Sequence, residues 1–147
     1  MTLKEQLNDA MKSAMKARDD LRLSAIRMVR AAIKNREIDT RVELDDLAVT
    51  DVISTLAKQR RESIRMYREG NRPELADKEQ LELAILLDFL PTQLNTEEID
   101  ALVSKTILDI AAQGTKDMGR VMKAVTPLTA GRADGKIVNE AVRRLLV

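Results

Sequence analysis

The sequence of 147 residues contains no cysteine and no histidine. The absence of cysteine excludes disulfides, zinc–thiolate sites and thiolate nucleophiles. The absence of histidine removes the commonest general base and the commonest metal ligand of proteins. Together these two absences exclude most of the catalytic and metal sites that a single sequence can reveal.

Aromatic residues are scarce too, because Tyr67 and Phe89 are the only two. Proteins that read single-stranded nucleic acid stack its bases against aromatic side chains, so we do not expect sequence-specific recognition of a single strand. A sheet protein would also need more β-branched and aromatic residues. The hydrophobic residues, 44% of the chain, instead suit an all-helical protein.

Long apolar runs and an excess of one charge are also missing. No run approaches the roughly 20 apolar residues of a membrane-spanning helix. Residues 1–17 are amphipathic, but Glu5 and Asp9 interrupt them and they contain no apolar signal core. The net charge is only +1, from 25 basic and 24 acidic residues. We therefore expect a cytoplasmic protein without a membrane segment.

Apolar residues at helical spacing cover most of the chain, and they predict seven helices and no strand. Residues 39–49 lose this period and are expected to form a loop, with Thr50 as the N-cap of the third helix. The best internal boundary lies between Pro91 and Thr96. We therefore expect a four-helix N-terminal domain (residues 1–91) and a small three-helix C-terminal domain (residues 92–147).

The segment "GRADGK" at residues 131–136 looks at first like a phosphate-binding loop. A P-loop requires four residues between its glycines and a hydroxyl residue after the lysine. Here three residues separate Gly131 from Gly135, and Ile137 follows Lys136. We interpret the segment as a turn in which Gly131 is left-handed and Asp134 caps the last helix.

Candidate catalytic groups are few. Ser13 follows Lys12 and Ser104 precedes Lys105, but neighbouring residues of a helix do not face each other. Glu79 and Glu82 share a helix face, yet a di-metal bundle site would also need histidine. Such carboxylates are usually solvated or capping groups. We expect no catalytic residue, no cofactor and no metal.

Basic residues gather in three segments. Residues 11–36 carry a net charge of +6 and residues 58–72 carry +4, whereas residues 115–147 hold seven basic and three acidic residues. Such faces are usually solvated, but they could instead contact the phosphates of a folded RNA. In the last segment, Gly131 and Gly135 would shape the turn, and the helix N-terminus beside it is a candidate anion site. The candidate nucleic-acid-binding residues there are Lys116, Arg120, Lys123, Arg132, Lys136, Arg143 and Arg144.

Four stretches together resemble the GatB/YqeY family over nearly the whole chain: "RLSAIRMVRAAIKNREI", "KQRRESIRMYREGNR", "FLPTQLNTEEI" and "DMGRVMKAVTPLTAGRADGKIVNEAVRRLL". This family contains YqeY-like proteins and the tail domain of the B subunit of the glutamine-dependent aspartyl/glutamyl-tRNA amidotransferase. The resemblance implies a helical N-terminal domain followed by a three-helix tail domain. In the amidotransferase the tail helps to hold tRNA, but this chain lacks the large catalytic body.

Three interpretations follow from the sequence. The first is a non-catalytic accessory protein that binds tRNA, or a tRNA-handling enzyme, through the C-terminal domain. The second is a protein–protein adaptor that docks through unused apolar surface such as residues 81–90. The third, which rests on the resemblance alone, is part of a carbon–nitrogen ligase with glutamine as amido-N donor.

Overall fold

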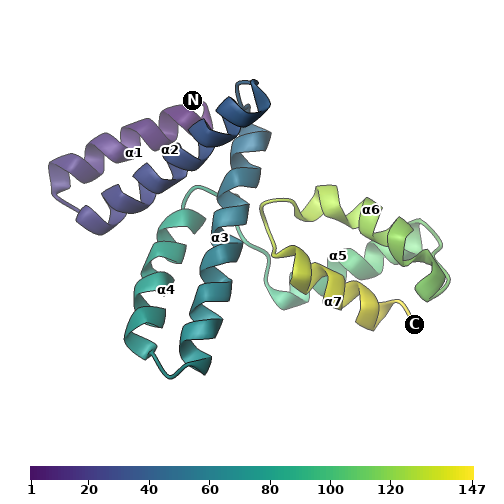
Figure 1. The fold of residues 1–147 in the computed structure, drawn as a ribbon. Coiled ribbons are helices and arrows are strands. Elements are labelled where there is room, and N and C mark those ends of the chain that lie inside the picture. Colours follow the sequence, from purple (N-terminus) through teal and green to yellow (C-terminus); the bar gives the residue numbers. More distant parts are fainter. The chain divides into compact units, whose positions relative to one another are not determined.

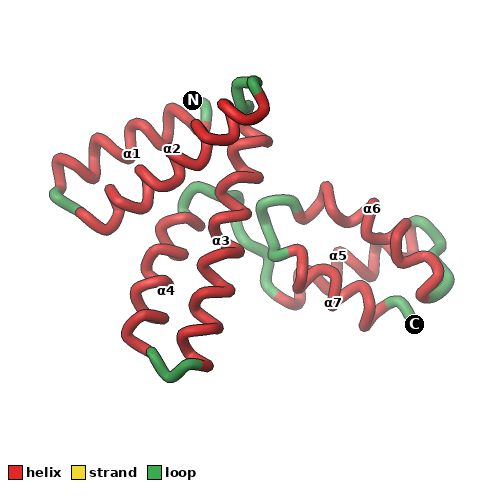
Figure 2. Tube along the Cα trace, in the orientation of Figure 1, coloured by secondary structure: helices red, strands yellow, loops and turns green.

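A computed structural model describes all 147 residues and contains seven α-helices, one 3₁₀ turn and no strand (Figures 1 and 2). The expected all-helical fold is therefore confirmed. The chain divides into two compact units, Met1–Pro91 and Thr92–Val147. The helices are α1 (Leu3–Ala17), α2 (Asp20–Thr40), α3 (Asp46–Glu69), α4 (Pro73–Leu87), α5 (Thr96–Asp109), α6 (Met118–Thr129) and α7 (Gly135–Leu145), with the 3₁₀ turn η1 (Thr115–Asp117) before α6.

Short polar side chains fix where most of these helices begin. A side-chain oxygen at the N-cap accepts a hydrogen bond from a first-turn N–H that would otherwise lack a partner. At α1 and α5 a glutamate three residues later bonds back to the cap and completes a capping box. The capping residues are Thr2, Asp19, Asp45, Asn95 and Asp134.

The first unit consists of two antiparallel helix pairs, α1 with α2 and α3 with α4, which pack on a shared core. Leu7, Ile26, Ile53 and Leu86 are at most 1% exposed and occupy its centre. Most of the apolar segment 81–90 also packs on this core, and Leu81 is its only large hydrophobic residue that is largely exposed. This segment therefore stabilises the unit, and the expectation that it offers unused apolar surface for docking is wrong.

An ionic cluster joins α3 to α4 at the edge of this core. The guanidinium of Arg60 lies 3.4 Å from Glu79 and 3.2 Å from Glu82, and all three side chains are at most 20% exposed. Arg60 also contacts the sulfur of Met28 on α2. The sequence placed Glu79 and Glu82 on one face but took them for solvated groups. The structure shows that they are mostly buried and share a single cation, Arg60.

The α2–α3 connection is shorter than the sequence predicted. Helix α2 continues to Thr40 and ends at Arg41 in a left-handed conformation, with φ of 58°. Helix α3 then begins at Asp46, and Asp45 caps it by accepting a hydrogen bond from Ala48 N–H. Thr50 lies inside α3, so its expected role as the N-cap is wrong. Asp45, five positions earlier, belongs to a residue type that is preferred over threonine at the N-cap.

The second unit is a three-helix bundle in which α5, α6 and α7 contact one another around a valine-rich core. The turn between α6 and α7 contains Gly131 at φ of 73°, which confirms the expected left-handed glycine. Residues 92–94 hold this turn. Leu94 N–H donates to the Arg132 carbonyl at 2.8 Å, and the Gln93 amide donates to the Gly131 carbonyl at 2.8 Å.

Candidate functional site

The seven candidate nucleic-acid-binding residues lie on η1, α6, the α6–α7 turn and α7. Three of them are committed to contacts within the second unit. Arg120 donates to the Ile110 carbonyl at 3.0 Å, and Arg132 donates to the Thr92 carbonyl at 3.3 Å. Arg144 makes a paired contact with both carboxylate oxygens of Asp100, at 3.1 and 2.7 Å. These three arginines therefore stabilise the second unit through contacts within it.

The other four candidates, Lys116, Lys123, Lys136 and Arg143, have no carboxylate within ion-pair distance. The N-terminus of α7 beside Lys136 was a candidate anion site. There, however, the Asp134 carboxylate accepts the hydrogen bond from Lys136 N–H at 3.0 Å. The chain's own capping group thus occupies the position that an external anion would take. The turn is accounted for as a helix connection.

The ion pair between Asp100 and Arg144 should make the stability of the second unit depend on pH. The hydrogen bond from Arg144 lowers the pKa of the Asp100 carboxyl. Because this pKa is depressed in the folded chain, the pair's stabilisation is present at neutral pH and is lost as the pH falls through the depressed value. We expect Arg144→Met to raise the pKa of Asp100, as measured by carbon-13 NMR titration of the carboxyl carbon. Arg143→Met should leave that titration unchanged, and an equal shift in both variants would contradict the assignment.

The candidate catalytic pairs do not assemble. Ser13, Lys12, Ser104 and Lys105 are all exposed, and no hydrogen bond joins either serine to its neighbouring lysine. No group of three or more acidic, cysteine or histidine side chains is arranged to hold a metal ion. No helix combines the length and the apolar character that a bilayer-spanning segment requires.

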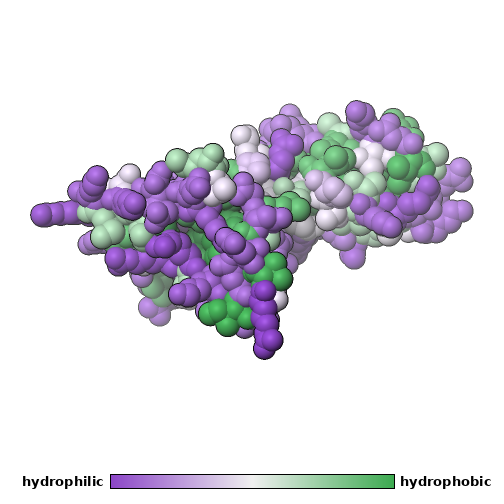
Figure 3. Space-filling view, turned by 90° about the horizontal axis from the view of Figure 1, so that it is seen from above, coloured by the Kyte–Doolittle hydropathy of each residue, from purple (hydrophilic) through white to green (hydrophobic).

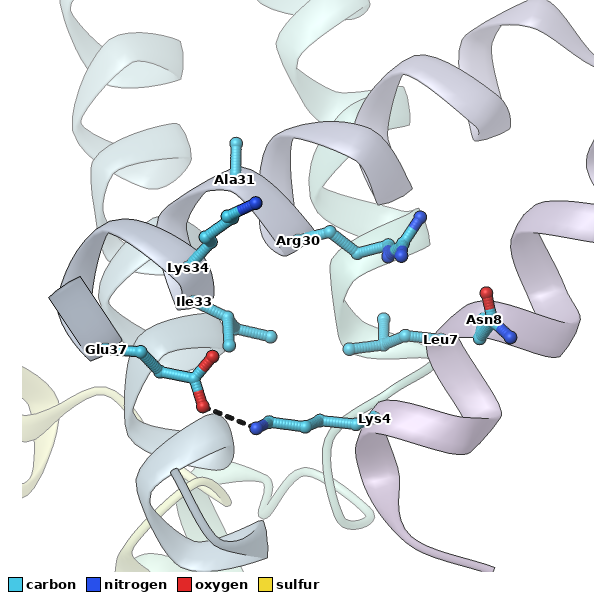
Figure 4. Close-up of a pocket in the computed structure, with 8 residues that line it drawn as sticks. All are labelled: Lys4, Leu7, Asn8, Arg30, Ala31, Ile33, Lys34 and Glu37. Atoms are coloured by element: carbon cyan, nitrogen blue, oxygen red, sulfur yellow. Dashed lines mark hydrogen bonds and ion pairs between the residues drawn. The ribbon is translucent and has the colours of Figure 1, made fainter. Parts of the chain in front are cut away.

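A pocket lies between α1 and α2 in the first unit, with a volume of about 390 Å³ (Figure 4). Leu7 from α1 and Ile33 from α2 point toward each other at its floor. Three cations and a single carboxylate line it, so the lining carries a net charge of +2. The lining residues are Lys4, Leu7, Asn8, Arg30, Ala31, Ile33, Lys34 and Glu37.

The single carboxylate of this pocket is already engaged. Glu37 accepts a hydrogen bond from the Lys4 ammonium across the two helices and another from Leu44 N–H at 2.8 Å. These contacts lower the pKa of Glu37, and the same ion pair raises the pKa of Lys4. Glu37 therefore remains ionised and bound to Lys4, so it does not neutralise the other two cations.

Those two cations, Arg30 and Lys34, are exposed and lie one turn apart on α2. Arg30 donates only to the sulfur of Met11, at 2.8 Å, and Lys34 has no carboxylate within ion-pair distance. A thioether is a weak acceptor and carries no charge. The sequence had identified both residues within a basic segment. It could not show that Lys4, Leu7 and Asn8 of α1 form the opposite wall.

The second unit has a hollow of a different kind. A groove of about 430 Å³ lies beside α5 and Leu128 of α6, and its two charged residues, Lys105 and Asp109, balance each other. Leu128 is 50% exposed, and nearby on α5 Leu108 is 80% exposed. In the space-filling view, separate hydrophobic areas lie among hydrophilic side chains (Figure 3). Nothing in this groove selects one ligand by charge.

Comparison with known proteins adds what geometry alone does not supply. The sequence model of a family described as "Yqey-like protein" matches residues 4–146. Three fungal relatives share the name "Altered inheritance of mitochondria protein 41, mitochondrial". That of Vanderwaltozyma polyspora is 38% identical over 81% of this chain, that of Lachancea thermotolerans 39% over 71%, and that of Pyrenophora tritici-repentis 30% over 96%. The chain spans 66%, 57% and 79% of their respective lengths.

These relatives correct two expectations from the sequence. Their shared name places them in mitochondria, so the expected cytoplasmic location is wrong. The name also points to the inheritance of mitochondria, so the interpretation as a tRNA-associated relative of the amidotransferase tail is wrong as well. The physical reason is the same in both cases. Basic helix faces favour contact with anions, but neither they nor the net charge specify a compartment or a particular polyanion.

Proposed function

The chain belongs to the YqeY-like protein family, and we propose that it is a non-covalent binding protein for an anionic ligand. We propose further that it serves the inheritance of mitochondria, the process for which its relatives are named. The binding site in this proposal is the pocket between α1 and α2.

The observation that carries the proposal is the unbalanced charge of the pocket. Its lining holds Lys4, Arg30 and Lys34 against Glu37 alone, and Glu37 is paired with Lys4. Two cations one helical turn apart repel each other. The low-dielectric walls of a pocket also strengthen the positive potential that the two cations produce inside it. An anion seated between them relieves that repulsion. The pocket is thus more favourable for an anion than an equally charged flat helix face would be.

The same lining limits the proposal to binding. General acid–base or nucleophilic catalysis needs a titratable group or nucleophile that a partner group activates. The pocket offers aliphatic side chains, one amide, cations and a carboxylate held by Lys4. These groups can attract and orient an anion.

Complementation tests the proposal. In a Saccharomyces cerevisiae strain without its relative, we expect this chain, carried into mitochondria by a fused cleavable leader, to restore normal inheritance of mitochondria. A double variant, Arg30→Glu with Lys34→Glu, should fail, because it changes the pocket's charge from +2 to about −2. The readout is the fraction of daughter cells that receive mitochondria.

A matched control is Lys78→Glu, since Lys78 is exposed on α4, away from the pocket. It should restore inheritance as well as the unaltered chain does. Circular dichroism must show equal helicity for all variants. Full restoration by the double variant would contradict the pocket as the site, and failure of the unaltered chain would contradict the shared process.

A further inference from the structure

We infer that the group bound in the α1–α2 pocket is a phosphate monoester, held chiefly by Arg30 and Lys34. This inference rests on the proposed function, because it names the ligand class of the same site. It is carried by the closed floor of the pocket, its charge and its free donors.

The apolar surface that the pocket exposes is larger than its polar surface, but its area is small. Leu7 is 1% exposed and Ile33 is 5% exposed, although both point into the space between the helices (Figure 4). A docked amphipathic helix inserts several side chains into an apolar groove, and an acyl chain also needs such a surface. The apolar area here is too small for either. It adds little binding free energy, so charge and hydrogen bonding must decide recognition, which suits a compact polar group.

The charge of the lining matches a dianion. The two cations that lack a carboxylate partner contribute +2. The Lys4–Glu37 pair contributes nothing further, and Glu43, which lies 3.6 Å from Lys4, is outside the lining. A phosphate monoester carries about −1.5 to −2 at neutral pH, whereas one carboxylate carries −1. A phosphate monoester thus neutralises both cations with one group, which a single carboxylate cannot do.

The free donors also fit phosphate oxygens. The guanidinium of Arg30 presents parallel N–H groups that can engage two oxygens of one phosphate, and the Lys34 ammonium can reach a third. Arg30 gives up only its contact with the Met11 sulfur to do so. On the opposite wall the half-buried amide of Asn8 can bond a hydroxyl or ester oxygen of the ligand.

The test is to titrate each probe into the whole chain at constant ionic strength. The NMR chemical shifts of residues 30 and 34 report binding. The probes are glycerol 3-phosphate, succinate, and vesicles of phosphatidylcholine with or without phosphatidic acid. Glycerol 3-phosphate should bind, and Arg30→Gln and Lys34→Gln should each weaken binding at least about tenfold, as loss of a charge-assisted contact does. Lys78→Gln should leave affinity unchanged.

The pH dependence tests whether the doubly ionised phosphate is the form that binds. The second pKa of a phosphate monoester is about 6, so affinity should fall severalfold between pH 7.5 and pH 5. Succinate should bind more weakly than glycerol 3-phosphate at pH 7.5. Binding of glycerol 3-phosphate identifies a soluble source of the phosphate group, and binding only to phosphatidic acid vesicles identifies a lipid headgroup.

The negative outcomes are also distinct. Succinate binding as tightly as either phosphate probe at pH 7.5 would overturn the inference but leave the proposed anion-binding function intact. If no probe shifts residues 30 and 34, both the inference and the proposed function are contradicted. Equal binding by the glutamine variants would likewise overturn the inference, because the phosphate would then sit elsewhere.

Discussion

Leu86→Ala is expected to lower the free energy of unfolding of the first unit by about 3 to 4 kcal/mol. Leu86 is 0% exposed and lies in the core that the four helices of this unit share. Removing its isobutyl group loses transfer free energy and leaves a cavity, because rigid neighbouring helices close the gap only in part. Urea denaturation followed by circular dichroism measures the change.

Leu81→Ala provides the matched control, since Leu81 lies on the same helix but is 57% exposed. It should cost no more than about 0.5 kcal/mol, as surface substitutions usually do. Equal losses for the two variants would mean that α4 does not present Leu86 to the core. The m-value should stay constant if only stability has changed.

Arg60→Met is expected to destabilise the same unit by about 2 to 3 kcal/mol, somewhat below the range for a fully buried pair. The substitution keeps much of the packing volume but leaves Glu79 and Glu82 mostly buried, close to each other and without their cation. Two desolvated like charges are more costly than the lost attraction alone. Urea denaturation at pH 7 gives the magnitude.

Two further variants identify the cause. Adding Glu79→Gln and Glu82→Gln to Arg60→Met should recover most of the lost stability, because the uncompensated charges are then gone. Arg65→Met removes a pair of contacts with Glu62 and Glu69 on the exposed face of α3, and it should cost only about 0.5 kcal/mol. If the triple variant is no more stable than Arg60→Met, the loss arises from packing and not from charge.

Features with a local cause could be predicted from the sequence. Apolar stripes at helical spacing depend only on nearby residues, and they gave seven helices and no strand. The cap at Asp134 followed from a short polar side chain before a periodic segment. The error at residues 39–49 had a local cause too. The apolar spacing there is weak, so the start of α3 was placed at Thr50, although Asp45 is a favourable N-cap residue.

Features that depend on which helix faces which could not be predicted. Glu79 and Glu82 appeared solvated because their cation, Arg60, lies on another helix. The pocket has the same origin, since Arg30 and Lys34 stood out only as part of a basic segment. Their opposite wall comes from α1. The seven basic residues of the second unit show the reverse case. Arg144 looked available for a ligand, and the structure pairs it with Asp100.

The hydrogen bonds that tie residues 92–94 to the α6–α7 turn decide how the second unit could be transferred to another protein. A cassette cut at the first residue of α5 would omit Gln93 and Leu94, and the carbonyls of Gly131 and Arg132 would lose their donors. A recombination point just after Pro91 keeps these donors with their acceptors. A transferable form of this unit must therefore begin a few residues before its first helix.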